Sequence, residues 1–112
     1  MTDFLAEIDV RVTPQENGSL KRFDEAPVEV VVRNNTERNV DLVIDLCSGE
    51  TIHWSGISHQ NVGLLAPQTS KKLDLSVIPL IRGTHQLPTL SFTDTLLGLT
   101  YKFNNLYHLQ VE

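Results

Sequence analysis

Apolar and polar side chains alternate with a period of two over most of the 112 residues of this chain. Such alternation is typical of β-strands that have one buried and one solvated face. It predicts strands at residues 4–13, 27–33, 40–47, 51–55, 62–65, 71–78, 85–93 and 101–111. No long window has the i, i+3, i+4, i+7 spacing of an amphipathic helix, so the pattern predicts an all-β chain.

Turn-forming residues separate these strands at regular intervals. Asn34 to Asn39 predict a hairpin that joins strands 27–33 and 40–47, because asparagine tolerates positive φ. Residues 20–26 and 56–61 are polar and predict loops, and Thr95–Gly98 predicts a turn. The pair Asn104-Asn105 predicts a bulge within the last strand. About 7–9 short strands with this turn spacing predict an antiparallel β-sandwich, organised as a single domain over residues 1–112.

The predicted core takes the apolar face of each strand. Its members are Ile8, Val10, Val30, Val32, Leu42, Ile44, Trp54, Leu73, Leu75, Val77, Leu87, Leu90, Phe92, Tyr101 and Phe103. We expect Leu75→Ala to cost about 2–5 kcal/mol as a cavity mutation. Cys47 shares the wetter face of its strand with two aspartates, so we expect Cys47→Ser to be nearly neutral. Trp54 has the same parity as Ile52, which favours a core position over an exposed interface anchor.

Composition argues against some classes of partner and some cellular compartments. The formal net charge of −5 argues against nucleic acid or an anionic membrane as a partner, since both require a basic face. The single cysteine, Cys47, allows no intramolecular disulfide and favours a cytosolic or nuclear compartment. No run approaches the roughly 20 apolar residues of a membrane span, and the first ten residues lack the features of a targeting segment. The sequons at Asn17 and Asn34 are therefore interpreted as turns.

Metal chemistry finds little support in the residue spacing. The four histidines, His53, His59, His85 and His108, do not have the spacing of a zinc site. Cys47 and His85 are free to meet in space, but two ligands do not make a site. We therefore predict no metal ligand and no cofactor-binding residue.

Nucleophilic and acid–base chemistry is equally unsupported. Ser55, Ser58 and Cys47 are the candidate nucleophiles, but Ser55 lacks the preceding glycine of a G-x-S-x-G elbow. Asp41 and Asp45 lie about 13 Å apart along one strand, too far for a paired acid–base site. The loop carboxylates Asp24, Glu25 and Asp94 lack the spacing of a calcium loop. We predict no catalytic residue, and hence that the chain is not an enzyme.

The last predicted strand is long and rich in β-forming residues. If it lies at the edge of a sheet, its free backbone is a template for pairing with a strand of a partner. Lys102 and His108 would protect such an edge only in part.

Several motifs occur in an order that resembles a known family. They are the segments 34–38 (NNTER), 52–58 (IHWSGIS), 63–70 (GLLAPQTS), 83–88 (GTHQLP) and 93–96 (TDTL), followed by Tyr101. From about residue 24 to residue 112 the chain resembles the C-terminal immunoglobulin-like domains of subunit 13 of the TRAPP (transport protein particle) complex. Similar tail domains occur in the large TRAPP subunits. The H-W-x-G-x-S and T-D-T-x-L elements are the more specific part of the match.

The resemblance implies an immunoglobulin-like sandwich that acts as a non-catalytic scaffold of a vesicle-tethering complex. TRAPP acts on Rab GTPases at the Golgi and in autophagy, and its exchange chemistry lies in the small core subunits, so no catalytic residue is carried over. The implied partners are other protein subunits, and the implied location is cytoplasmic and peripheral to Golgi or vesicle membranes. Nucleic acid, direct membrane insertion and a small-molecule substrate are not implied. Family members are several times longer, so the chain is either the tail of a longer protein or a small independent protein.

Two other classes stay open. One is an extracellular or surface β-sandwich that binds carbohydrate or a protein ligand. The aromatic content of 6% and the single cysteine count against it. The other is a small hydrolase or metal enzyme, which requires a His/Asp/Glu cluster that the spacing does not provide.

Overall fold

The computed structural model describes residues 7–14, 20–56, 58–104 and 106–112. Within this part of the chain every regular element is a strand. The strands are β1 (Ile8–Pro14), β2 (Ala26–Asn34), β3 (Val40–Leu46), β4 (Ile52–Ser55), β5 (His59–Leu65), β6 (Ser70–Pro79), β7 (Gly83–Gln86), β8 (Leu90–Asp94), β9 (Leu99–Phe103) and β10 (His108–Val111). None of the described segments forms a helix long and apolar enough to cross a membrane.

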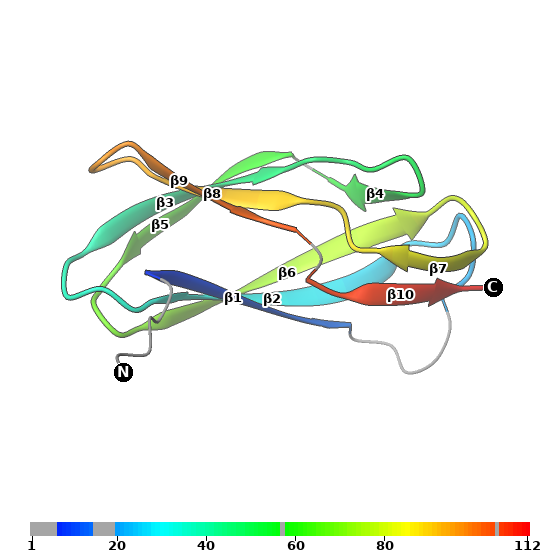
Figure 1. Ribbon diagram of the computed structural model, residues 1–112, viewed down its shortest axis with the longest axis horizontal. Coiled ribbons are helices and arrows are strands. Elements are labelled where there is room, and N and C mark those ends of the chain that lie inside the picture. Colours follow the sequence, from blue (N-terminus) through cyan, green and yellow to red (C-terminus); the bar gives the residue numbers. More distant parts are fainter. Residues whose placement is uncertain (1–6, 15–19, 57, 105) are drawn as a thin grey trace, which may run out of the picture.

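Two four-stranded antiparallel sheets form the body of the sandwich (Figure 1). One sheet has the order β1-β2-β6-β4 and the other has the order β5-β3-β8-β9, while β7 and β10 form a separate two-stranded sheet. This architecture confirms the predicted antiparallel β-sandwich.

The core lies between the sheets and follows the predicted alternation. On β2, Val28, Val30 and Val32 are almost completely buried. The ring of Phe92 on β8 meets Phe103 on β9 edge to face, with centroids 6.1 Å apart. Trp54 is buried, as its parity predicts, and its indole Nε1 donates a hydrogen bond of 3.4 Å to the carbonyl of Thr89.

Every residue of the predicted core lies in this core or packs against it, although Leu73, Leu75, Tyr101 and Phe103 are only partly buried. Further residues complete the core: Leu20, Ala26, Val28, Val40, Leu46, Ile52, Val62, Leu65, Leu109 and Val111.

The predicted hairpin between strands 27–33 and 40–47 is wrong. β2 and β3 belong to different sheets, and residues 35–39 cross from one sheet to the other. The backbone of Asn34 pairs instead with the neighbouring crossing, through Asn34 N–H to Thr69 O (2.9 Å) and Gln68 N–H to Asn34 O (2.8 Å). The local turn chemistry was correct, but it does not determine which strand a chain pairs with.

Two predicted long strands are each divided between sheets. The predicted strand 85–93 is interrupted at Pro88, which has no N–H for a ladder, so β7 pairs with β10 while β8 pairs with β3 and β9. The predicted strand 101–111 separates into β9 and β10, so a change of sheet replaces the predicted bulge. Its first half is nevertheless a sheet edge, as the prediction allowed, because β9 is the last strand of its sheet.

Two predicted loops also differ. β5 begins at His59, so residues 59–61 are strand rather than loop. In segment 20–26, Leu20 is buried and bridges to Val111 in parallel pairing. The same segment contains a turn in which Asp24 N–H donates to Lys21 O, with the exposed Phe23 at φ +71°.

Candidate interaction site

A buried asparagine organises the end of the sandwich where the chain crosses between sheets. Asn34 Nδ2 donates to the carbonyl oxygens of Leu65 (3.0 Å) and Arg38 (2.8 Å), and Oδ1 accepts from the Thr36 N–H (2.9 Å) and hydroxyl (2.6 Å). The side chain is fully buried and all its polar atoms are used. Asn34 therefore ends β2 and holds the turn that follows it through its side chain. Asn17, the other sequon, lies outside the described residues.

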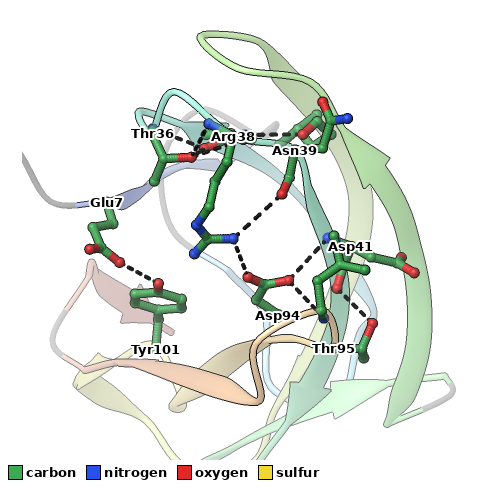
Figure 2. Close-up of polar contacts among 11 residues, drawn as sticks. Glu7, Thr36, Arg38, Asn39, Asp41, Asp94, Thr95 and Tyr101 are labelled. Carbon is green, nitrogen blue, oxygen red and sulfur yellow. Dashed lines mark hydrogen bonds and ion pairs between the residues drawn. The ribbon is translucent and has the colours of Figure 1, made fainter.

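Arg38, whose carbonyl accepts a hydrogen bond from Asn34, forms an ion pair with Asp94 at the end of β8 (Figure 2). The guanidinium of Arg38 approaches Oδ2 of Asp94 at 2.6 Å, and Oδ1 of the same carboxylate accepts the backbone N–H groups of Asp41 (3.2 Å) and Leu96 (3.1 Å). The side chain of Asp94 is fully buried, whereas that of Arg38 is 34% exposed. A buried carboxylate is tolerated only when donors surround it, and here three donors do so.

These contacts determine the ionisation of the pair. Burial acts to raise the pKa of Asp94, but the hydrogen bonds from Arg38 and from the two backbone N–H groups outweigh it, so the pKa of Asp94 lies below its ordinary value. The hydrogen bond to Asp94 also raises the pKa of Arg38. Both groups are therefore charged at neutral pH.

A second polar contact, near the Arg38–Asp94 pair, joins β9 to the residue before β1. The hydroxyl of Tyr101 on β9 donates to Oε2 of Glu7 at 2.5 Å (Figure 2). Burial, and then this hydrogen bond to a carboxylate, raise the pKa of Tyr101 to about 12. The contact ties the edge strand β9 to the start of β1.

The turn between β8 and β9 is fixed at its base by Asp94. Gly98 N–H donates to Asp94 O at 2.8 Å, with Gly98 at φ +70°, and Thr95 N–H donates to Asp41 O at 2.9 Å. The exposed fractions of Leu96, Leu97 and Leu99 are 56%, 59% and 42%. We refer to these three residues as the leucine turn. A held backbone with exposed apolar side chains is the arrangement of an interface anchor, because little ordering remains to be done on binding.

The histidines considered for metal binding lie apart from this cluster. His59 Nδ1 contacts Asp45 Oδ1 at 2.5 Å on an exposed face, and His85 Nε2 contacts the carbonyl of Arg82 at 2.9 Å. His53 and His108 are exposed. Over residues 7–14, 20–56, 58–104 and 106–112, no group of three or more His, Cys, Asp or Glu is placed to hold a metal ion.

The candidate nucleophiles are also dispersed. Ser55 Oγ donates to Glu25 Oε1 at 3.2 Å, and Ser58 is exposed in the loop before β5. Cys47 is exposed and lies with His85 on the wall of an open hollow at the opposite end of the sandwich from the leucine turn. Cys47 and His85, the pair that the sequence left open, therefore line the same hollow.

The Arg38–Asp94 pair was not predicted from the sequence, because the two residues are 56 positions apart. Each belongs to a motif that carries the family resemblance: Arg38 ends the segment 34–38 and Asp94 is the centre of the segment 93–96. In the sequence, only the presence of both motifs in one chain pointed to a contact between Arg38 and Asp94.

The model of one protein family matches residues 22–111, a range that includes every motif of the resemblance. It is described as trafficking protein particle complex subunit 13, C-terminal. The chain belongs to this family. Subunit 13 of Xenopus laevis is 32% identical over 101 residues, which cover 88% of this chain and 24% of that protein. Subunit 13 of Pongo abelii is 36% identical over 75 residues, covering 67% of this chain and 18% of that protein. The chain thus spans about a quarter or less of these relatives.

Solved structures support the fold alone. A trypsin-activated alpha-2-macroglobulin from Escherichia coli matches 95% of this chain and 7% of its own length, with a TM-score of 0.70 and 16% identity. A FixG-related protein from Vibrio parahaemolyticus matches 96% of this chain and 99% of its own length, with a TM-score of 0.60 and 17% identity. At such identities the sandwich is shared, and no role is transferred.

Proposed function

We propose that this subunit 13 family domain is a non-catalytic protein-interaction module that contributes subunit contacts to a TRAPP-type trafficking complex. The complex would act in the cytoplasm, peripherally at Golgi or vesicle membranes. Membership of the subunit 13 family supports a place in a TRAPP-type complex. The leucine turn supports a contact made through exposed apolar side chains. None of the relatives reported above supports the alternative of a carbohydrate-binding surface sandwich.

The leucine turn carries this proposal. Complete burial of a fully exposed leucine side chain contributes about 1.5–3 kcal/mol. The three leucines are 56%, 59% and 42% exposed, so each would contribute roughly half of that on binding. Because Asp94 and Asp41 hold the backbone of the turn, binding requires little loss of conformational entropy. The formal net charge of −5 disfavours insertion into an anionic bilayer, so a protein is the preferred occupant.

The non-catalytic assignment is supported by how the polar groups are used. Asp94 accepts three hydrogen bonds within the fold, and Asn34 uses every polar atom of its side chain. Asp94, whose pKa is lowered, and the buried Asn34 are therefore both engaged in holding segments of the fold together. Perturbed ionisation arises in structural networks as well as in active sites, and here its causes are structural.

A pull-down tests the proposal. The tagged 112-residue chain would be incubated with vertebrate cell lysate, and recovered TRAPP subunits quantified by mass spectrometry. We expect wild type to recover them and Leu96→Ser/Leu97→Ser to lose about tenfold or more, which corresponds to about 1.4 kcal/mol. Ile81→Ser is the matched control, since Ile81 is a similarly exposed apolar residue at the other end of the sandwich. Recovery of no TRAPP subunit by wild type, or equal recovery by the leucine variant, would contradict the proposal.

A further inference from the structure

The open hollow at the far end of the sandwich has a volume of about 660 Å³. It lies between the segment that follows β3 and the segment that runs from β7 toward β8. The residues that line it are Cys47, Ser48, Gly49, Thr51, Thr84, His85, Gln86, Leu87, Pro88, Thr89 and Asn104. No Asp, Glu, Lys or Arg is among them, and the only aromatic ring is that of His85.

One wall of the hollow is an unpaired strand edge. β7 pairs with β10 in antiparallel register, and Leu87 N–H donates to Tyr107 O at 2.8 Å just beyond the ladder. Hydrogen-bonded pairs alternate along an antiparallel ladder, so His85 and Gly83 also direct their N–H and C=O groups toward β10. The intervening residues, Thr84 and Gln86, direct theirs away from β10.

The second edge of β7 has no strand beside it in the part of the chain that the structure describes. Thr84 and Gln86, whose backbone groups point that way, both line the hollow. The hollow therefore presents two backbone donors and two backbone acceptors in a row.

The edge of β5, in contrast, is protected against the addition of a further strand. There the register shifts between Leu42 and Val43, Gly63 takes φ +103°, and Lys71 Nζ donates to the Val62 carbonyl at 2.6 Å. A bulge and a lysine are standard ways to prevent strand addition. β7 has the sequence GTHQ, with no bulge, lysine or proline.

We propose that the hollow is a docking groove in which an extended segment of a partner protein adds to β7 as the third strand of the β7–β10 sheet. Donors and acceptors on residues i and i+2 of a strand match the repeat of an extended peptide backbone. Pockets for small organic ligands are mostly apolar and aromatic, whereas this lining is mostly small and polar. Since the domain carries a net charge of −5 and the lining is uncharged, the segment is neutral or basic, with small side chains facing Ser48 and Thr51.

The free protein provides the first test. In hydrogen-exchange NMR of the 112-residue chain, we expect the amides of Thr84 and Gln86 to exchange at least about tenfold faster than those of His85 and Leu87. Equal protection of the four amides would overturn the assigned edge.

Binding is tested with a displayed library of random octapeptides selected against the wild-type chain. We expect enriched peptides that, on titration, slow exchange at Thr84 and Gln86 and shift the amide signals of Ser48 and Thr51. Gln86→Pro removes one outward N–H while keeping a strand-compatible φ, and it should weaken binding by about tenfold, the equivalent of one backbone hydrogen bond. Gln86→Ala is the matched control and should bind within about twofold of wild type.

Several results would overturn the proposal. They are a selection that enriches no peptide, peptides that bind Gln86→Pro as well as wild type, peptides that perturb only the leucine turn, and pairing of two copies of the chain through β7. The slowed exchange at Thr84 and Gln86 is measured on wild type, so it decides the matter even if Gln86→Pro folds poorly. Because the leucine turn lies at the opposite end, loss of TRAPP recovery and loss of peptide binding are separable failures.

Discussion

Replacement of Asp94 by asparagine tests whether the ion pair holds the crossing segment 35–39 against the end of β8. The side chain is fully buried and accepts hydrogen bonds from Arg38, from Asp41 N–H and from Leu96 N–H. Asn keeps one carbonyl oxygen for the two backbone donors but loses the charge that pairs with Arg38. The amide Nδ2 then faces the guanidinium, but Arg38 is 34% exposed and is free to turn toward solvent. The variant thus removes one charge-assisted hydrogen bond and little packing.

The magnitude follows from that single loss. A hydrogen bond to a charged group contributes about 1.5–3 kcal/mol, so we expect Asp94→Asn to lower the free energy of unfolding by that amount. Asp94→Ala leaves the two backbone donors unpaired as well, and we expect about 3–5 kcal/mol. The matched control is Asp45→Asn. Its partner His59 and its own carboxylate are both well exposed, so the loss is below about 1 kcal/mol.

Urea denaturation at two pH values is the assay. With an m-value of about 1.5 kcal/mol per molar, Asp94→Asn should lower the midpoint by about 1–2 M at neutral pH. The pKa of Asp94 is lowered by folding, so the native state binds fewer protons than the unfolded state below the unfolded pKa of about 3.9. The stabilisation is complete above that pH and is lost as pH falls through the folded pKa, where the gap between wild type and variant closes. An unchanged midpoint at neutral pH, or a gap that widens in acid, would refute this role of Asp94.

Four further substitutions are expected to stabilise the domain, to destabilise it by different amounts, or to leave its stability unchanged. Phe23→Asn should raise the free energy of unfolding by about 1 kcal/mol in equilibrium denaturation, because asparagine tolerates the positive φ that strains phenylalanine there. A destabilised variant would mean that the exposed ring contributes packing. Phe92→Ala should lower the free energy of unfolding by about 3–5 kcal/mol. Leu75→Ala should lower it by about 1–2 kcal/mol, below the range expected from sequence, since Leu75 is only partly buried. Calorimetry that ranks the two variants in reverse would contradict this description of the core. Cys47→Ser should leave the thermal midpoint unchanged, because Cys47 is exposed; unfolding of this variant would show that the thiol is packed.

The alternation of side chains predicted the strands and their buried faces well, because a period of two is a local property of the backbone. It did not predict which sheet each strand joins. Residues 34–39 have the chemistry of a hairpin turn, yet the contacts of Asn34 with Leu65, 31 residues away, make them a crossing between sheets. In the strand predicted at 85–93 the buried side chains change parity at Pro88, from Leu87 to Leu90 and Phe92, and the two halves lie in different sheets.

The same limit applies to the two proposed sites. Nothing in the sequence distinguishes Arg38, in the loop after β2, or Asp94, at the end of β8, until the topology brings them together. Likewise, GTHQ at 83–86 carries no signal of a free edge, because the pairing of β7 with a strand near the C-terminal end decides which backbone groups are left over. Sequence identified the turn at residues 95–98, but only the structure shows the hydrogen bonds to Asp94 and Asp41 that hold its base.

The two sites have different chemistry, and this predicts separate occupants. They lie at opposite ends of a body with a longest dimension of 43 Å; one offers apolar side chains and the other offers main-chain polar groups. A single partner spanning both would bind with a high effective concentration at the second site, so loss of either site would reduce its recovery almost as much as loss of both. With separate occupants, Leu96→Ser/Leu97→Ser reduces recovery of one set of proteins and Gln86→Pro reduces recovery of another. The triple variant, which combines these substitutions, then loses both sets. We expect the second pattern, because an anchor that inserts leucines and a groove that accepts an extended backbone select different segments. Quantitative mass spectrometry of proteins retained by the wild type and the three variants decides between them, and a common set of proteins lost equally in every variant would show that one partner wraps both ends.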